Sequence, residues 1–203
     1  VTDYRPVLDR VGRYDCIFMP TCACLSEQTL ARIRRFVQEG GNLVATFDTS
    51  LYDENGRARN GFGLADLFGV ARIAGLTAYQ NFNYFGIDVA DPLFEGLERD
   101  RLPAPGFGLE IEPAPGARVL ARFYRPQAGR YTDPTEREKP AILMNRFGKG
   151  QCLYLAGTFG ETAMVHAFVE YRRLFANAAR VLARPVVEVE GTLGNVEVVA
   201  RRR

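Results

Sequence analysis

The chain has 203 residues, of which 47% are hydrophobic and 25% are charged, so its composition is that of a folded globular protein and excludes disordered and fibrous classes. Its formal net charge is only +2, and the basic residues are spread along the chain, which argues against a nucleic-acid partner. The sequence contains neither an apolar run of about 18 residues nor a signal-peptide pattern, so we expect no membrane partner.

The cysteines and the first residue give information about the cellular compartment of the protein. Cys16, Cys22, Cys24 and Cys152 have neither zinc-site spacing nor the density of a disulfide scaffold, so we expect a cytoplasmic protein without a metal or other cofactor. The chain opens with Val1 rather than Met, which suggests a fragment or processed product whose targeting signals are lost.

The first quarter of the chain predicts a βαβ unit. Residues 14–19 form a short apolar run of the kind that makes a buried strand. Ser26 can cap a helix whose apolar residues recur at helical spacing, and Gly40 and Gly41 end it. We expect Gly41 to adopt a backbone conformation that a side chain would disfavour. Residues 42–47 then predict a strand covered on both faces in a parallel sheet.

The middle of the chain has weaker patterns. Residues 64–68 predict a short helix, residues 79–87 an aromatic-rich strand, and residues 117–124 a further strand. Four prolines interrupt the pattern between residues 103 and 115, and residues 125–140 form a polar loop.

The last third predicts a hairpin, a helix and two more strands. Residues 141–146 and 151–156 flank a glycine-bearing turn, as in a β-hairpin. Residues 163–182 predict one long amphipathic helix, which Pro185 ends. Two alternating segments, VVEVE and VEVVA, follow within residues 186–203 and predict the beginning of a C-terminal β module.

Three motifs carry a resemblance to a known family. The run YDCIFMPTCACLSEQTLARIRRFVQEGGNLVATFDTSLYDENG, at residues 14–56, resembles the trimerisation domain of family 42 β-galactosidases and related glycoside hydrolases. RFGKGQCLYLAGTFG at residues 146–160 resembles the hairpin of that family, and LFANAARVLA resembles its closing helix. The resemblance implies an α/β fold that is flavodoxin-like and class I glutamine amidotransferase-like. Its sheet would be mostly parallel, with helices on both faces and an antiparallel hairpin at one end.

The resemblance also implies a function. It predicts a non-catalytic oligomerisation or accessory domain, residues 1–185, that packs against an upstream (β/α)8 catalytic barrel and against neighbouring subunits of a homo-oligomer such as a trimer. Family members usually open with a strand, a helix and a second strand, and the VTD at the start resembles the end of that second strand. We therefore expect the first strand and helix to be missing, and the edge beside Cys16–Met19 to be open and prone to self-association.

Candidate ligand or interface residues lie where parallel strands end, because ligands bind beyond the carboxyl ends of such strands. These candidates are Thr21, Asp48, Thr49, Asp53 and Thr158. Asp48 and Asp53 could divide the work of acid and base. The segment 48–55 is equally typical of a turn in which short polar side chains bond local amides.

An enzymatic alternative requires a nucleophile on a sharp strand-to-helix turn. Ser50 follows the second strand, but residues 47–52 contain no glycine to allow such a turn. Cys22 or Cys24 could instead serve an amidotransferase-like cysteine hydrolase, since a helix N-terminus can lower the pKa of a thiol. The base would have to be His166, the sole histidine, which falls inside a predicted helix rather than at a strand tip.

A second alternative is a sugar-binding module. Tyr79, Phe82 and Tyr84 could stack on sugar rings or fill an interface, or they could belong to a half-buried strand. Arg57 and Arg59 could meet a partner surface or a sugar carboxylate, or they could lie in a solvated loop.

Overall fold

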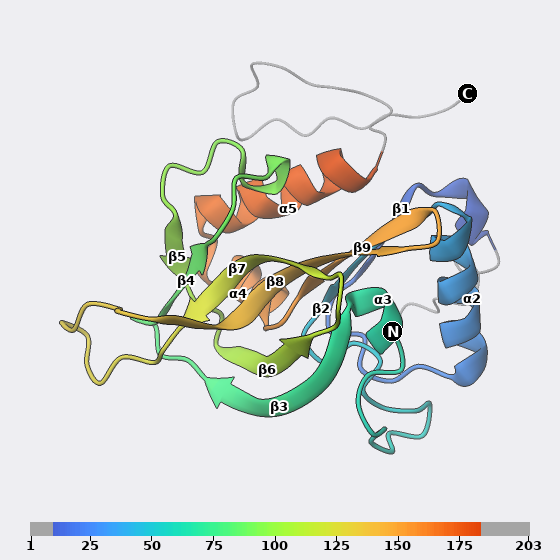
Figure 1. Cartoon of the computed structure of the whole chain (residues 1–203), viewed down its shortest axis with the longest axis horizontal. Helices are drawn as coiled ribbons and strands as arrows, with labels where there is room; N and C mark the ends of the chain where they lie inside the picture. Colours follow the sequence, from blue (N-terminus) through green and yellow to red (C-terminus); the bar gives the residue numbers. More distant parts are fainter. Residues whose placement is uncertain (1–9, 184–203) are drawn as a thin grey trace.

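The protein is described here by a computed structural model that covers residues 10–183, so both the VTD segment and the expected β module at residues 186–203 lie outside the described residues. Figure 1 shows a curved sheet with helix α5 on one side and helix α3 with a small second sheet on the other. The seven-stranded sheet has the order β1-β2-β9-β8-β7-β4-β5, and β3 pairs with β6 in the second sheet.

The elements have the following bounds. The strands are β1 (Cys16–Met19), β2 (Asn42–Thr46), β3 (Val70–Ala78), β4 (Tyr84–Ile87), β5 (Arg101–Pro103), β6 (Phe107–Pro113), β7 (Arg118–Tyr124), β8 (Arg137–Phe147) and β9 (Gly150–Leu155). The helices are η1 (Val11–Arg13), α2 (Glu27–Glu39), α3 (Ala65–Phe68), η2 (Pro92–Phe94), α4 (Phe159–His166) and α5 (Val169–Leu182). None of the helices in this part of the chain is long and apolar enough to cross a membrane.

The predicted βαβ unit is present. Strands β1 and β2 are parallel, with Phe18 opposite Val44, and helix α2 connects them. The Ser26 hydroxyl accepts a hydrogen bond from the Thr29 amide at 3.2 Å, which satisfies one of the amides left open at the start of α2. Strand β2 is also parallel to β9 and is buried from Leu43 to Thr46, as expected of a strand with covered faces.

The end of α2 corrects the expectation for its glycines. Gly40, not Gly41, has the left-handed backbone, with φ of 119°. The Gly40 amide donates to the Val37 carbonyl at 3.1 Å and the Gly41 amide to the Phe36 carbonyl at 2.9 Å, which is the Schellman pattern. Gly41 is required for a different reason, because a Cβ there would lie 2.2 Å from the ring of Phe36.

The expectation of a mostly parallel sheet was wrong. The only parallel neighbours in the described sheet are β1 with β2 and β2 with β9, whereas β9-β8, β8-β7, β7-β4 and β4-β5 are antiparallel. The predicted β8–β9 hairpin therefore begins an antiparallel half rather than capping a parallel sheet. Hairpins and non-helical loops can join antiparallel neighbours, whereas parallel neighbours need longer crossovers.

Several boundaries in the middle of the chain also differ from prediction. The strand expected over residues 79–87 is confined to β4, because residues 80–83 form a turn in which the Gln80 amide donates to Asn83 Oδ1 at 2.7 Å. Strand β3 was not predicted at all. The polar loop is shorter than expected, since β8 already begins at Arg137.

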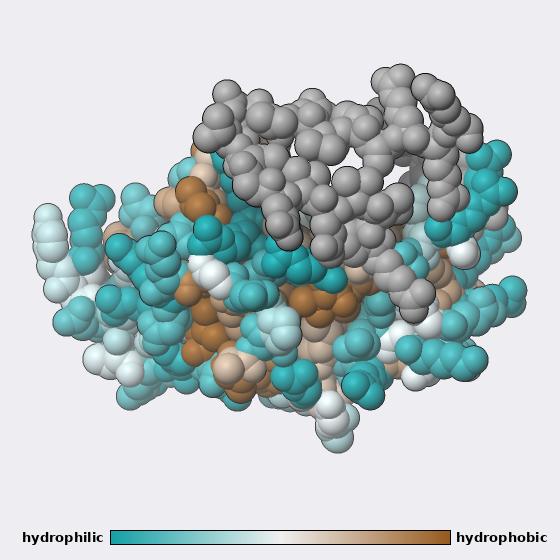
Figure 2. Space-filling model, turned by 90° about the horizontal axis from the view of Figure 1, so that it is seen from above, coloured by the Kyte–Doolittle hydropathy of each residue, from teal (hydrophilic) through white to brown (hydrophobic). Residues whose placement is uncertain are grey.

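The long helix expected over residues 163–182 is two helices. Ala167 separates α4 from α5 and has a left-handed backbone with φ of 51°. The change of direction leaves Val165 and Val169 exposed by 68% and 62%, although their spacing suggested a buried stripe, and Met164 beside them is exposed by 84%. Figure 2, which looks onto the face that carries α5, shows hydrophobic groups gathered in patches among hydrophilic ones.

Strand β1 forms one edge of the described sheet. Within residues 10–183 it pairs only with β2, so its other edge has no partner among the described residues. A mostly apolar groove of about 430 Å³ lies beside it, between β1 and helices α4 and α5, with Phe18, Pro20, Met164 and Phe175 in its lining. Phe18 itself is 42% exposed.

We expect Gly41→Val to lower the free energy of unfolding by more than about 1 kcal/mol, because an overpacked side chain must displace the Phe36 ring. Chemical denaturation monitored by circular dichroism measures the effect. Gly12→Val is the control, since no atom lies within 4 Å of a Cβ at Gly12. Equal midpoints for Gly41→Val and the unmodified chain would contradict the assigned contact.

Candidate functional site

Hydroxyl groups gather where β1 and β2 end. The Thr21 amide donates to Thr46 Oγ1 and the Cys22 amide to Thr49 Oγ1, both at 3.1 Å. The buried Thr49 hydroxyl also lies 2.7 Å from the Thr46 carbonyl oxygen and 3.0 Å from that of Met19. These bonds tie the loop after β1 to the turn after β2, so the hydroxyl of Thr49 is engaged by the backbone.

The turn after β2 is sharp even though it lacks glycine. Phe47 and Ser50 both have positive φ, 50° and 67°, and such conformations cost about 1–3 kcal/mol each for residues with side chains. The Tyr154 hydroxyl donates a hydrogen bond to the Phe47 carbonyl at 2.6 Å. Ser50 is fully buried, and its Oγ accepts from the Leu64 amide at 3.1 Å. The strained position that a nucleophile would occupy directly after the strand therefore carries a phenyl ring.

The two cysteines after β1 differ in environment. Cys22 is half-buried, and burial, followed by the nearby Asp48 carboxylate, raises the pKa of its thiol. A raised pKa keeps the thiol protonated at neutral pH, whereas nucleophilic attack requires the thiolate. Cys24 is exposed and pairs with Tyr52 in an isolated parallel bridge.

His166 lies away from the strand-end loops. It is the last residue of α4, and its ring stacks on Phe168 at 5.4 Å. Gly160, in the first turn of the same helix, faces Pro20, and six residues of helix place His166 about 9 Å further along the axis. Within residues 10–183, His166 makes no hydrogen bond or ring contact with Cys22 or Cys24.

The two aspartates of the turn have opposite electrostatic environments. Burial raises the pKa of Asp48, whose Oδ1 is buried without a hydrogen-bond partner. Asp53 Oδ1 accepts from the amides of Arg57 at 2.9 Å and Asn55 at 2.8 Å, and these bonds, the Arg57 bond first, lower the pKa of Asp53. The bonding of Asp53 is that of a local turn.

Two further candidates are engaged in internal bonds. Thr158 Oγ1 accepts from the Phe107 amide at 3.2 Å and so joins the start of α4 to β6. Arg59 forms an ion pair with Glu27 and donates to the Leu25 carbonyl at 2.8 Å, which fastens the loop to the start of α2. In the described part of the chain, no group of three or more His, Cys, Asp and Glu side chains is placed to hold a metal ion.

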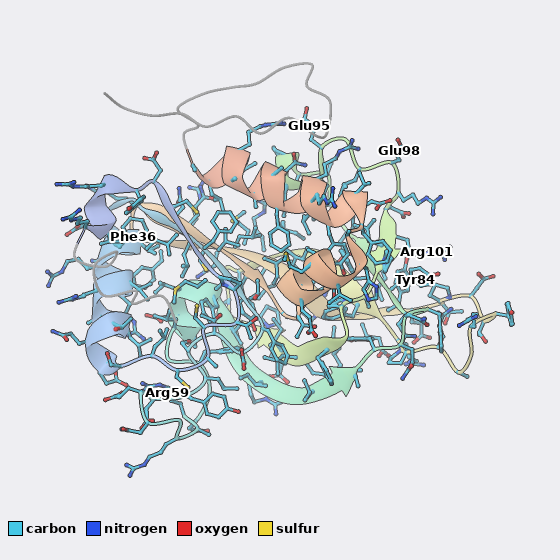
Figure 3. All side chains as sticks on the ribbon, turned by 180° about the vertical axis from the view of Figure 1, so that it is seen from behind. Phe36, Arg59, Tyr84, Glu95, Glu98 and Arg101 are labelled. Atoms are coloured by element: carbon cyan, nitrogen blue, oxygen red, sulfur yellow. The ribbon has the colours of Figure 1, made fainter. Side chains whose placement is uncertain are left out.

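The aromatic residues after β3 do not share one surface. Tyr79 is buried against Phe123 at 4.7 Å, and burial raises the pKa of its phenol. Phe82 lies half-buried in the turn before β4. Tyr84 is half-buried on β4 with the guanidinium of Arg101 over its ring at 5.1 Å, and Figure 3 shows these two side chains next to each other.

A polar pocket of about 720 Å³ adjoins Tyr84, and sequence reasoning missed it. Its lining residues are Tyr84, Glu98, Arg99, Asp100, Arg101 and Tyr124. The alternation of residues along β7, in which Phe123 is buried, is the signal that could have placed Tyr124 on the opposite face. The stretch 98–101 has no comparable pattern.

A guanidinium fixed by several bonds contacts two residues of this lining, Tyr124 and Asp100. Arg137 lies over the Tyr124 ring at 5.3 Å, donates to the Tyr124 hydroxyl at 2.9 Å, and pairs with Asp88 and Asp100, each at 3.1 Å. Gly86 makes this arrangement possible, because a Cβ there would lie 2.6 Å from Arg137 Nε.

Comparison with known sequences gives a consistent result. A family model described as the β-galactosidase trimerisation domain matches residues 1–178. The β-galactosidase BbgII of Bifidobacterium bifidum is 30% identical over 167 residues, which make up 80% of this chain and 22% of BbgII. The chain thus spans about a fifth of the length of that relative.

Solved structures share the fold. A β-galactosidase from Bacillus circulans sp. alkalophilus matches with a TM-score of 0.66 and 21% identity, over 88% of this chain and 24% of the other. A β-galactosidase from Rahnella sp. R3 matches with a TM-score of 0.62 and 24% identity, over 84% of this chain and 23% of the other. Cytoplasmic Protein STM3548 from Salmonella typhimurium matches with a TM-score of 0.61 and 15% identity, over 88% of this chain and 75% of the other.

The environment of Asp48 generates a pH-dependent prediction. A carboxyl with a raised pKa binds its proton more tightly in the folded state, so its contribution favours folding at low pH and is lost as the pH rises through that pKa. We expect the unfolding free energy of the unmodified chain, relative to Asp48→Asn, to fall between about pH 4 and pH 7. Urea denaturation of both proteins at each pH measures it.

Asp53→Asn is the matched control. The pKa of Asp53 is lowered, so the corresponding difference should stay nearly level between about pH 4 and pH 7 and fall only below about pH 4. A pH-independent difference for Asp48→Asn would show that its carboxyl is solvated like an ordinary surface aspartate.

Proposed function

This chain belongs to the β-galactosidase trimerisation domain family, and from that premise we propose that it is a non-catalytic accessory domain that joins the subunits of a glycoside hydrolase. The family match over residues 1–178 is the observation that carries the proposal. Three-fold assembly requires that one surface of each copy contact a different surface of the next copy.

We further propose that the catalytic residues of the parent enzyme lie outside this chain. The chain covers only 22% to 24% of the three β-galactosidases described above. The remainder of such a chain would hold the (β/α)8 catalytic barrel, against which this domain would pack. The substrate of the parent would be a β-galactoside, as the names of the relatives suggest.

The geometry of the strand ends supports a role without chemistry. The residue at the strained turn after β2 is Phe47, which has no nucleophilic group. The Cys22 thiol has a raised pKa, and its Sγ lies 3.7 Å from the carbonyl oxygen of Pro20 rather than beside a base. His166 stacks on Phe168 at the far end of α4.

The proposal also covers the ancestry of the fold and the cellular compartment of the protein. The parallel β1-α2-β2 unit and its β9 neighbour support descent from a flavodoxin-like, class I glutamine amidotransferase-like fold, in which the antiparallel strands are an elaboration. All four cysteines are free thiols, which supports a reducing compartment such as the cytoplasm.

We expect the 203-residue chain to hydrolyse neither glutamine nor nitrophenyl galactosides. Cys22→Ala, Cys24→Ala and His166→Ala should each change the free energy of unfolding by no more than about 1 kcal/mol, because none completes a buried polar network. Glutaminase or esterase turnover that disappears in Cys24→Ala, with the fold intact by circular dichroism, would establish the cysteine hydrolase instead.

We also expect the chain to self-associate through the β1 edge and its apolar groove. Sedimentation velocity over a range of concentrations should show species larger than the 22.7 kDa single chain. Phe18→Glu should weaken association at least about tenfold, because the charge would be buried at the contact. Leu76→Glu, at another exposed apolar residue on β3, is the control.

Two outcomes would contradict this assembly surface. The first is a monodisperse monomer at high concentration of the unmodified chain. The second is an equal loss of association in Phe18→Glu and Leu76→Glu, which would place the contact elsewhere or show a general effect of added charge.

A further inference from the structure

Two tyrosine rings face outward beside each other at the antiparallel end of the sheet. Strands β4 and β7 are antiparallel with Phe85 opposite Phe123, and both phenylalanines are buried. Tyr84 and Tyr124 are the adjacent residues on the two strands, so their side chains project from the opposite face. Both border the polar pocket of about 720 Å³.

The guanidinium groups over these rings are held very differently. Arg137 is fixed over Tyr124 by its bonds to that hydroxyl, to Asp88 and to Asp100. The guanidinium of Arg101 covers Tyr84, and within residues 10–183 this guanidinium makes no ion pair or hydrogen bond. An exposed cation–π contact is a weak restraint, so Arg101 can turn from the ring toward a ligand.

The pocket also offers charged groups without internal partners. Glu98 and Arg99 make no hydrogen bond or ion pair in the described part of the chain. Figure 3 shows Glu98 on the loop near Tyr84 and Arg101. A carboxylate accepts hydrogen bonds and a guanidinium donates them. A hydroxyl group both donates and accepts, so the pocket can satisfy both capacities of a bound hydroxyl.

The charges of the lining decide between ligand classes. Glu98 and Asp100 balance Arg99 and Arg101, so a phosphate or nucleotide would gain from the arginines but would also face two carboxylates. A sugar ring is uncharged, with an apolar C–H face that suits a tyrosine ring and a rim of hydroxyls that need both donors and acceptors. The volume is within the range of small-molecule sites.

We propose that this pocket, floored by Tyr84 and Tyr124 and bordered by Arg101, binds a saccharide. The sugar ring stacks on Tyr84 after Arg101 swings aside, and its hydroxyls bond Arg101, Glu98 and Asp100. The rigid Arg137 holds the Tyr124 ring in place, so the floor is formed before the ligand arrives. The site does not depend on the assembly role, since it lies at the opposite end of the sheet from β1.

Isothermal titration of the 203-residue chain with lactose and with β-1,4-galactotetraose tests the proposal. We expect dissociation constants of about 0.1–10 mM, as is usual for a shallow exposed site. Tyr84→Ala and Arg101→Ala should each weaken binding at least about fivefold. Arg101→Ala alters an exposed side chain without internal bonds, so it remains informative even if Tyr84→Ala impairs folding.

Matched substitutions at the other end of the molecule serve as controls. Tyr14→Ala and Arg146→Ala change exposed residues of the same types and should leave binding unchanged. The proposal is overturned if neither saccharide binds at about 50 mM, or if Arg101→Ala binds as tightly as the unmodified chain. Binding of inorganic phosphate in place of the saccharides would also overturn it, because the pocket would then be an anion site.

Discussion

One buried side chain, Tyr154, connects the parts of this structure that have to stay in register. Its ring stacks on Phe68 of α3 at 4.7 Å and meets Phe62 edge-on at 5.3 Å. Its hydroxyl donates to the Phe47 carbonyl and so restrains the strained turn after β2. Complete burial raises its pKa far above the ordinary value, which keeps the phenol neutral and able to donate. Strand β9, helix α3 and the strand-end loops thus share one anchor.

The parallel part of the fold follows from local signals, and the antiparallel part does not. The cap at Ser26, the glycines after α2 and the continuous apolar strands each act within a few residues. Strand β3 gives no such signal, because only Val70 is buried along it and register shifts interrupt its alternation. The break at Ala167 also lacks a local cause, since no glycine or proline marks it. Packing across the molecule sets both features.

In the candidate site, too, some features were predictable from the sequence and others depend on the fold. The chain positions of Thr49 and Ser50 at a strand end were predictable, but their hydroxyls bond neighbouring backbone groups that only the fold brings close. The pocket beside Tyr84 depends on Arg101 and Tyr124, which lie 17 and 40 residues further along the chain. Cross-strand pairing unites them, and no motif at fixed spacing describes such a site.

The pairing of β2 with β9 also governs how the molecule can fold. About a hundred residues separate these adjacent strands, so loop closure must precede their contact, and such non-local pairing is slow. On a ribosome that adds about 5–20 residues each second, β2 emerges roughly 5–20 s before β9 is complete. Throughout that interval the apolar edge of β2 has no native neighbour on one side. Chaperone protection of the nascent βαβ unit therefore matters more here than for the β8–β9 hairpin, whose strands are made within seconds of each other.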